Sequence, residues 1–242
     1  RVLDNCSKAF SNDSIFVFTD NNDVSMEVKK WGYNVYLTSE NCSSGSERIA
    51  SKIKDLIAEA WSLTPDLLNS KLGKQIIDKT FVLNVQGDLP FIDSNCLIRI
   101  ITEANKPNNE FDVITPIYKI NKKVDLKDPN IVKVLIGNQN KVIYFSRSPL
   151  PYIRDQNIDD WQDFHDYWGH IGIYGYKANV LINWNSMTTS KLEDSEKLEQ
   201  LRLLDNGLVF KTVKVNGNFL SVDTLEQLEE ARMYCKTFKE IN

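Results

Sequence analysis

Two aspartates follow predicted β-strands and could together hold a divalent cation. Asp88 comes after the apolar run TFVLNV, in the turn QGDLP, and Asp223 comes after the run VFKTVKV. The carboxyl ends of parallel strands lie at one edge of an α/β sheet, which is where such sheets bind ligands. A few hard oxygen ligands, with room left for water and phosphate oxygens, suit Mg2+. Asp88 and Asp223 could therefore converge on one magnesium site.

Both aspartates also have a structural interpretation. Thr224 and Gln227 match a capping box, and an Asp directly before a helix is favoured by the helix dipole without any ligand. Aspartate is also a common turn residue, which accounts for Asp88. The residues alone leave both interpretations open.

The segment SSGSER (43–48) is a candidate binding site for a phosphate or a nucleotide base. Ser44 and Glu47 have the spacing of a capping box, so a helix is expected to begin here. Small residues in its first turn expose backbone N–H groups, and Arg48 adds a guanidinium to the positive end of the helix. An ordinary N-cap with a surface arginine is the alternative.

The run HIGIYGY is a predicted strand with a candidate ligand-binding face. Alternation places His170, Tyr174 and Tyr176 on one side, and a glycine between them leaves room for a ligand. His170 and Tyr174 could hydrogen-bond a polar substrate, or the histidine could be a satisfied core residue. A zinc site at His165 and His170 is not expected, because no third ligand is evident.

Two arginines and a predicted helix supply further polar groups. Arg147 and Arg154 flank SPLPYI, and each could bind a carboxylate or pair with neighbouring acidic residues. A helix is expected over 192–206, with leucines in its buried stripe. The residues of its polar face are Glu193, Glu196 and Gln200. A solvated face is the default interpretation of that pattern.

The elements that must position these residues alternate along the first half of the chain. Their β-α-β-α-β-α-β order predicts an α/β fold with a parallel sheet covered by helices on both faces. The expected strands are 14–20, 34–39, 80–85 and 111–120, and the expected helices are 23–32, 44–61 and 93–105. A polar, partly helical connection is expected over 62–79. After residue 131, two strands joined by a Gly-Asn turn indicate a more antiparallel section.

The composition is typical of a globular protein. Of the 242 residues, 42% are hydrophobic and 26% are charged, and a net charge of −4 gives no basic footprint for nucleic acid. The longest apolar runs are too short to span a membrane. Four widely separated cysteines suit free thiols in a reducing compartment. We therefore expect a cytoplasmic protein that binds neither nucleic acid nor membrane.

Taken together, these segments resemble one family, the CMP-Kdo synthetases or 3-deoxy-manno-octulosonate cytidylyltransferases. Each stretch is short, but the set occurs in the order and near the spacing of the family and covers most of residues 14–232. The stretches are SGSER, NVQGDLPFI, VKV, YFSRSPLPYIRD, HIGIYGYKANVL, LEDSEKLEQLRLLDNG and VDTLEQLEEAR.

The resemblance implies an enzyme that transfers CMP from CTP to 3-deoxy-D-manno-octulosonate (Kdo) and releases pyrophosphate, for lipopolysaccharide or a related glycan. Asp88 and Asp223 match its catalytic aspartates, which hold the Mg2+ cofactor. Nucleotide-binding roles are implied for Ser46, Arg48 and Gln86. The positions that match residues around the sugar acid are Gln86, Arg147, Arg154, His170, Tyr174, Glu199 and Gln200.

The same resemblance implies a single cytidylyltransferase domain over 1–242 with the nucleotide-diphospho-sugar transferase fold. That fold is an α/β three-layer sandwich around a mixed, mainly parallel sheet. Members of the family are typically homodimers. We expect the segment 148–185 to contribute to both the dimer interface and the sugar site.

The family begins with a strand and a loop of the type PARxxSxRLPGKPL, which holds the triphosphate, and nothing in this sequence matches it. We expect this segment to lie upstream of the first residue given. Two alternatives stay open. One is a cytidylyltransferase for another sugar acid, such as amino-Kdo or a nonulosonic acid, and the other is an inactive sugar-binding homologue without the CTP loop.

Overall fold

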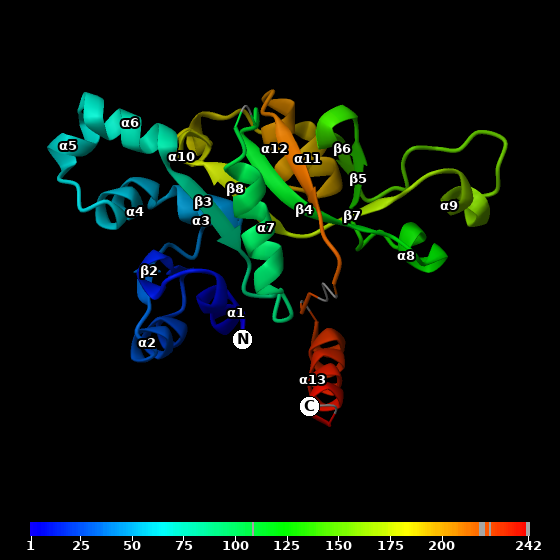
Figure 1. The fold of residues 1–242 in the computed structure, drawn as a ribbon, viewed down its shortest axis with the longest axis horizontal. Helices are drawn as coiled ribbons and strands as arrows, with labels where there is room; N and C mark the ends of the chain where they lie inside the picture. Colours follow the sequence, from blue (N-terminus) through cyan, green and yellow to red (C-terminus); the bar gives the residue numbers. More distant parts are fainter. Residues whose placement is uncertain (108, 218–220, 223, 241–242) are drawn as a thin grey trace.

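The chain folds into an α/β structure (Figure 1). The computed structural model describes residues 1–107, 109–217, 221–222 and 224–240, the last six of them by their backbone alone. The strands are β1 (Phe16–Thr19), β2 (Asn34–Leu37), β3 (Phe81–Val85), β4 (Val113–Lys119), β5 (Lys133–Ile136), β6 (Val142–Ser146), β7 (Trp168–His170), β8 (Ile173–Lys177) and β9 (Phe210–Lys214).

The helices are of very different lengths. The first seven are α1 (Val2–Ala9), α2 (Asn22–Lys30), α3 (Gly45–Ala50), α4 (Ile53–Ala60), α5 (Pro65–Asn69), α6 (Lys71–Lys79) and α7 (Ser94–Ala104). The others are α8 (Lys123–Lys127), α9 (Trp161–Phe164), α10 (Ala178–Ile182), α11 (Lys191–Glu196), α12 (Gln200–Asp205) and α13 (Leu225–Glu240). Among the described residues, no helix has both the length and the apolar character that a membrane span requires.

The main sheet is mainly antiparallel, so the prediction of a mainly parallel sheet was wrong. Its strand order is β3-β8-β4-β7-β5-β6, with β9 paired to β4, and β4–β9 is the parallel pair among its described pairings. The strands β1 and β2 form a separate parallel pair. The prediction failed because β8 lies between β3 and β4 and is antiparallel to both. Local alternation of strands and helices carries no signal for a strand that arrives from much later in the chain.

Strand direction, unlike strand pairing, follows the prediction. Because β3 and β4 are both antiparallel to β8, they run in the same direction, and β9 runs parallel to β4. The carboxyl ends of these three strands therefore lie at one edge of the sheet. The amino end of β8 reaches the same edge, where Val85 pairs with Ile173. The turn after β3 and the segment before β8 consequently meet there.

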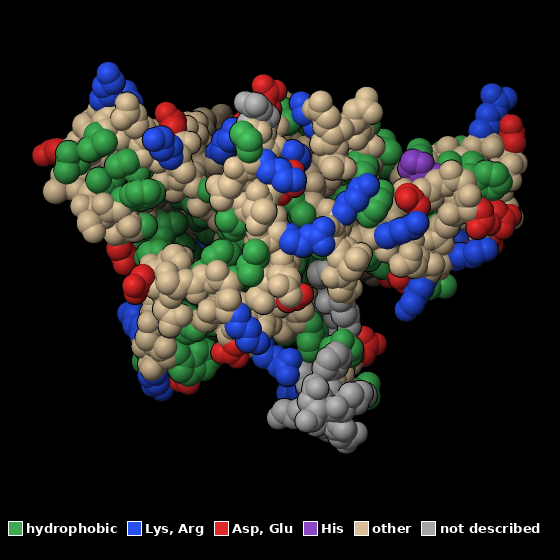
Figure 2. All heavy atoms as spheres, in the orientation of Figure 1, with side chains coloured by type: hydrophobic (Ala, Val, Ile, Leu, Met, Phe, Trp, Pro, Cys, Tyr) green, Lys and Arg blue, Asp and Glu red, His purple; other side chains and the backbone are tan. Residues whose placement is uncertain are grey.

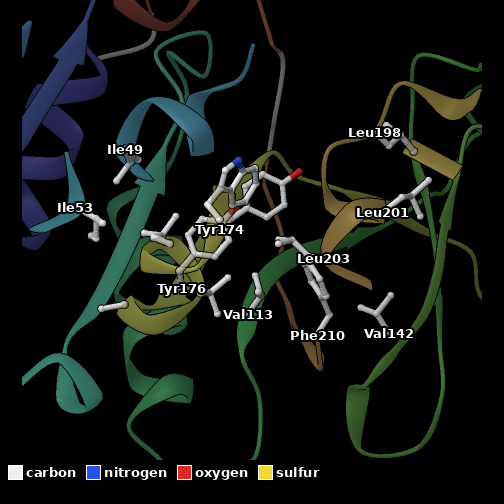
Figure 3. Packing of buried hydrophobic residues seen from close by; sticks show 14 of the residues in the cluster. Ile49, Ile53, Val113, Val142, Tyr174, Tyr176, Leu198, Leu201, Leu203 and Phe210 are labelled. Atoms are coloured by element: carbon white, nitrogen blue, oxygen red, sulfur yellow. The ribbon is translucent and has the colours of Figure 1, made fainter. Parts of the chain in front are cut away.

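Helices cover both faces of the sheet and produce three layers. On one face, α7 packs against β4, β8 and β9, and α1 packs on α7. On the other face, α3 packs against β3, α10 against β8 and α12 against β6. The alternation predicted for HIGIYGY is confirmed, because Ile173 lies in the core beneath α7 and Tyr174 and Tyr176 lie in the opposite core. Figure 3 shows the two tyrosines between Ile49 of α3 and Leu201 of α12.

Two expected helices and one expected connection differ in detail from the structure. The helix expected over 44–61 is divided into α3 and α4, and the one expected over 192–206 is divided into α11 and α12. The expected polar connection over 62–79 contains two helices, α5 and α6. In both divided helices the apolar spacing is present, but the helix is interrupted, after Ala50 in the first and after Glu196 in the second.

The division between α11 and α12 changes the role of the polar residues around it. Lys197 adopts the left-handed conformation (φ 53°, ψ 48°). The Glu196 carboxylate accepts hydrogen bonds from Ser146 Oγ and from the Arg147 backbone N–H, both at 2.7 Å. As a result Gln200 turns inward and is only 2% exposed. The interpretation of Gln200 as part of a solvated face was therefore wrong.

An arm built from α8, α9 and the segments around β7 extends away from the sheet (Figure 1). Its small core consists of Ile120, Leu126, Trp161 and Tyr167. Ion pairs on its surface are Lys119–Asp166 (2.6 Å), Lys123–Asp160 (3.8 Å) and Lys127–Asp159. Figure 2 shows side chains of both charge signs on this arm. Because exposed ion pairs contribute about 0–1 kcal/mol each, the apolar core is the main source of its stability.

Candidate functional site

A buried hydrogen-bond network on the α3 side of the sheet is centred on Ser46. Its Oγ donates to Glu199 Oε1 (2.8 Å) and lies 2.7 Å from the Tyr176 hydroxyl and 3.3 Å from Asn84 Nδ2. A serine hydroxyl has one proton and two lone pairs. Because that proton goes to the Glu199 carboxylate, Tyr176 and Asn84 must both donate to Ser46. All the hydrogen-bonding capacity of this hydroxyl is therefore used within the chain.

Glu199 is the charged group of this network. Burial raises the pKa of the Glu199 carboxyl, and the hydroxyls of Ser44 and Ser46 partly offset that effect. Its second oxygen, Oε2, is buried and has no hydrogen-bond partner within the described part of the chain. A buried polar oxygen without a hydrogen bond costs about 1–3 kcal/mol, and a ligand that donates to it would remove this cost. A hydroxyl group of a ligand could donate to Oε2.

The network continues through α12 and the strand pair β7–β8. The Tyr174 hydroxyl donates to Gln200 Oε1 at 3.1 Å. The Tyr174 ring stacks on that of Tyr176 with centroids 5.8 Å apart, and the His170 ring lies 5.3 Å from Tyr174. His170 Nε2 lies 2.9 Å from Thr115 Oγ1. Burial lowers the pKa of His170 to about 3, so the imidazole is neutral near pH 7.

We call this connected set the polar cluster. Its members are Ser46, Asn84, Thr115, His170, Tyr174, Tyr176, Glu199 and Gln200. The structure thus brings together Ser46 of the predicted nucleotide-binding residues with four of the predicted sugar-binding residues. Its donors and acceptors suit a ligand with several hydroxyl groups, because each hydroxyl both donates and accepts.

The turn after β3 adds Gln86 and Asp88 to this region. A Cβ atom added to Gly172 would lie 3.6 Å from the Gln86 amide group, so the glycine lets Gln86 lie close to the chain before β8. The backbone N–H of Val222 donates to the Asp88 carbonyl at 2.9 Å, which brings the chain after β9 to this turn. Asp223 lies outside the described residues, so its convergence with Asp88 stays a prediction.

Arg48 links α3 to the two-stranded sheet. Its Nη2 pairs with Asp20 Oδ2 at 2.6 Å, and its Nη1 donates to Thr38 Oγ1 (2.6 Å) and to the Ser39 carbonyl (3.2 Å). Asp20 and Thr38 directly follow β1 and β2. In this structure the guanidinium therefore fixes the ends of these strands relative to the helix start that the sequence marks as a nucleotide-binding element.

Two predicted helix caps are present. Ser44 Oγ accepts from the Glu47 N–H at 3.2 Å, as a capping box requires, although the Glu47 carboxylate binds the Ser43 N–H (2.7 Å) instead of that of Ser44. At the start of α13, Thr224 Oγ1 accepts from the Gln227 N–H (3.2 Å) and Gln227 Oε1 accepts from the Thr224 N–H (3.1 Å). The second cap is a complete capping box.

The two predicted carboxylate-binding arginines have their described contacts outside the polar cluster. Arg147 donates from Nε to the Glu196 carbonyl (2.7 Å) and from Nη1 to the Pro129 carbonyl (2.9 Å). Arg154 is 91% exposed, and its ion pair among the described contacts is with the adjacent Asp155 at 3.4 Å. Arg147 therefore supports the turn that precedes Glu199, and Arg154 lies on the surface of the arm.

Sequence reasoning gave no role to Asn84, Thr115 or Glu196. Each of the first two is a polar residue inside an otherwise apolar strand, and a buried polar group requires a hydrogen-bond partner. Thr115 carries a second signal, because it precedes a proline that cannot donate to the sheet. The role of Glu196 had no comparable signal, since helical spacing placed it on an exposed face.

Comparison with solved structures defines the class of protein. The structure of a CMP:2-keto-3-deoxy-manno-octonic acid synthetase in complex with CTP matches with a TM-score of 0.73 and 27% sequence identity, over 92% of this chain and 80% of that one. The fold also matches a 4-diphosphocytidyl-2C-methyl-D-erythritol synthase from Anaerococcus prevotii (TM-score 0.54, 15% identity, 97% of this chain and 87% of that one). The fold is that of a nucleotidyltransferase.

Sequence comparison identifies the family within that class. The family model described as cytidylyltransferase matches residues 1–214. The 3-deoxy-manno-octulosonate cytidylyltransferase of Thermodesulfovibrio yellowstonii is 32% identical over 93% of this chain and 83% of its own length. The corresponding protein of Fusobacterium nucleatum is 34% identical over 93% of this chain and 80% of its own length. The chain belongs to the cytidylyltransferase family, and the resemblance noted from its motifs is confirmed.

Proposed function

We propose that the protein transfers CMP from CTP to the anomeric hydroxyl of Kdo, giving CMP-Kdo and pyrophosphate. The observation that carries this proposal is the polar cluster at the carboxyl end of β3. Glu199 Oε2 and the neutral His170 ring can accept from sugar hydroxyls, and the Gln200 amide can donate to them. Relatives that match over 93% of this chain carry the name of this activity, which supports the same assignment here.

For this reaction the protein must position two substrates and compensate the negative charge of the phosphate groups. The reaction is a displacement at the α-phosphate, for which positioning and electrostatic stabilisation supply most of the catalysis. Ser46 fixes the Glu199 carboxylate, and Tyr174 fixes Gln200. The rings of Tyr174 and Tyr176 stack on each other, and their hydroxyl groups contact Gln200 and Ser46. The cluster therefore binds and orients the sugar acid, and no protein nucleophile is required.

The residues at this edge of the sheet fit Mg2+. Asp88 offers a hard carboxylate, and Val222, the neighbour of Asp223 in sequence, is hydrogen-bonded to the Asp88 carbonyl. Mg2+ is usually held by one or two carboxylates together with substrate phosphate oxygens. The lack of a group of three acidic, histidine or cysteine ligands among the described residues is compatible with that mode. A bound Mg2+ would neutralise phosphate charge and lower the pKa of the attacking hydroxyl.

Pyrophosphate release from CTP and Kdo, measured with and without Mg2+, tests the proposal. We expect release that depends on both substrates and stops on addition of EDTA. Asp88→Ala should lower kcat/KM by a factor of about 100 to 1,000, the size of effect seen when one preorganised electrostatic group is removed. Asp13→Ala, at an exposed position, is the matched control. Release with amino-Kdo or a nonulosonic acid but not with Kdo would reassign the substrate, and no release with any of them would refute the proposal.

We propose further that two copies associate through the arm. Tyr152, Phe164 and Val124 are 73%, 60% and 70% exposed, although the arm already has a core of its own. Exposed aromatic residues are typical of interfaces between protein chains. A hollow of about 780 Å³, between the turn after β5 and α9, lies beside Phe164 and offers a concave surface for a second copy.

A reducing compartment such as the cytoplasm suits this enzyme. Cys6, Cys42 and Cys96 are free thiols in the described part of the chain. Burial raises the pKa of Cys6 to about 11 and that of Cys96 to about 12, so both stay protonated and unreactive at neutral pH. These thiols pack as small apolar groups.

A further inference from the structure

We propose that Thr115 is a positioning residue that keeps the proton of the His170 ring on Nε2 and leaves Nδ1 as a hydrogen-bond acceptor for the sugar acid. The identity of the ligand rests on the proposed function, whereas the position of the proton rests on this chain alone. Three features of the molecule fix this proton: an irregularity in the sheet, the single proton of the Thr115 hydroxyl and the neutrality of the imidazole.

The irregularity lies where β4 faces the β7–β8 segment. Ile114 pairs with Gly175, but Ile117 pairs with His170, so three steps along β4 correspond to five steps along the facing chain. The facing chain therefore contains two additional residues between its two paired sections. Bulges of this kind interrupt the ladder and redirect side chains, and they are common beside active sites.

Two carbonyl groups of the bulge lie beside Thr115. Pro116 is the next residue of β4 and has no N–H to donate to the facing chain. The Thr115 hydroxyl supplies the missing donor, since its Oγ1 lies 2.8 Å from the Ile173 carbonyl and 3.3 Å from the Ile171 carbonyl. Thr115 is completely buried, so water cannot take over this task.

The direction of the bond between Thr115 and His170 follows from this arrangement. Carbonyl oxygens only accept, so the single hydroxyl proton of Thr115 points to them and its lone pairs remain for other partners. His170 Nε2 lies 2.9 Å from Thr115 Oγ1 and must therefore donate. The opposite arrangement would place threonine lone pairs against two carbonyl oxygens. The imidazole thus carries its proton on Nε2.

The other ring nitrogen is consequently a base. His170 is neutral near pH 7, because burial disfavours the charged form. Packing holds the ring in place, with the Phe145 centroid 5.1 Å and the Tyr174 centroid 5.3 Å away. Within the described residues, no hydrogen bond uses Nδ1. A neutral ring with a fixed proton can accept a hydrogen bond from one hydroxyl, and it lacks the positive charge that would attract phosphate groups.

Nitrogen NMR of the two histidines tests the proton position directly. The chain contains only His165 and His170, so protein labelled with ring-15N histidine gives two sets of signals, and His165→Asn leaves the His170 set alone. In the wild-type protein at pH 7 without substrate, we expect Nε2 to appear as the protonated nitrogen and Nδ1 as the bare one. The opposite assignment would overturn the proposal. This measurement needs no turnover, so it stands even if Kdo proves not to be the substrate.

Substitutions of Thr115 test its role. Thr115→Val keeps the shape and removes the hydroxyl, whereas Thr115→Ser keeps the hydroxyl. We expect Thr115→Val to mix the two tautomers and to raise the KM for the sugar acid about tenfold, the equivalent of one lost hydrogen bond, with the KM for CTP unchanged. Thr115→Ser should retain the wild-type tautomer and KM. A Thr115→Val protein with the wild-type spectrum would contradict the proposal, and if that variant fails to fold, the wild-type spectrum decides.

Discussion

At the scale of single residues, the two carboxylate oxygens of Glu199 have different surroundings. Its Oε1 is held by Ser46, and its Oε2 is buried without a partner within the described residues. Burial raises the pKa of this carboxyl, so the folded protein binds a proton there more readily than an exposed glutamate does. A ligand hydroxyl that donates to Oε2 would make the ionised form less costly, which supports the role in sugar binding that we propose for Glu199.

Glu199→Gln should stabilise the protein in a pH-dependent way. Because the pKa of Glu199 is raised in the folded state, its ionisation is harder there than in the unfolded chain, whose glutamates titrate near pH 4.3. The resulting loss of stability is absent below that pH and is fully present once the pH exceeds the raised pKa. We therefore expect a higher Tm for the variant at pH 8 and little difference at pH 4.

Scanning calorimetry at the two pH values gives this result directly. Glu40→Gln, at an exposed position, is the control and should leave the Tm unchanged at both. The variant should also lose activity, because the carboxylate is part of the polar cluster. A Tm gain of equal size at both pH values would mean that the effect comes from packing and not from charge.

At the scale of elements, Lys133 joins the segment before β5 to the residue that follows β6, at the base of the arm. Its Nζ donates to the carbonyls of Asp128 (2.7 Å), Ile131 (2.9 Å) and Arg147 (2.8 Å). An ammonium group has three donors, and all three are used. Lys133 is 1% exposed, and burial lowers its pKa. The arm is thereby fixed to the end of β6, next to the turn that leads to Glu199.

Lys133→Met should be strongly destabilising. The substitution retains much of the apolar stem but leaves three part-buried carbonyls without this donor, each at a cost of about 1–3 kcal/mol. We expect the free energy of unfolding, measured by urea titration, to fall by about 3 kcal/mol or more. Lys30→Met is the control, because the Lys30 side chain is 71% exposed in a surface ion pair, and it should change the value by less than about 0.5 kcal/mol. Similar losses for both variants would contradict the role given to Lys133.

The elements also set the limit of what the sequence could predict. Strand positions, helix caps and the alternation of His170 and Tyr174 with the isoleucines were all accessible, because they depend on local spacing. The insertion of β8 between β3 and β4 and the inward turn of Gln200 were not. Both result from contacts between segments far apart in the chain, such as that of Glu196 with Ser146. The motif resemblance gave the family because it used the order of many segments at once.

At the scale of the whole molecule, the arm is the surface through which we propose that two copies of the protein associate. It has its own core around Trp161 and Tyr167, and it carries exposed Tyr152 and Phe164. Its charges of both signs favour no single-sign partner such as nucleic acid (Figure 2). A second copy of the chain is therefore the partner that we propose for this surface.

Serine substitutions on the arm should weaken self-association. If the arm is the interface, Tyr152→Ser combined with Phe164→Ser removes its largest exposed apolar groups and should raise the dimer dissociation constant at least about tenfold. Sedimentation velocity over a range of concentrations measures this change. Met26→Ser, at a position 55% exposed on α2, is the matched control. A monomeric wild-type protein, or an unchanged dissociation constant in the double variant, would exclude this interface.

The irregularity opposite Thr115 has an evolutionary consequence, because the number of additional residues in the facing strand is even. It displaces the facing strand by an even number of residues, so His170 stays on the same side as Tyr174 and Tyr176 across the interruption. Loss or gain of one residue between His170 and Ile173 would exchange the inner and outer faces, whereas a change of two would preserve them. Sequence drift at this point is therefore restricted to changes in pairs. Divergent copies of the gene should vary in length here by even numbers or not at all.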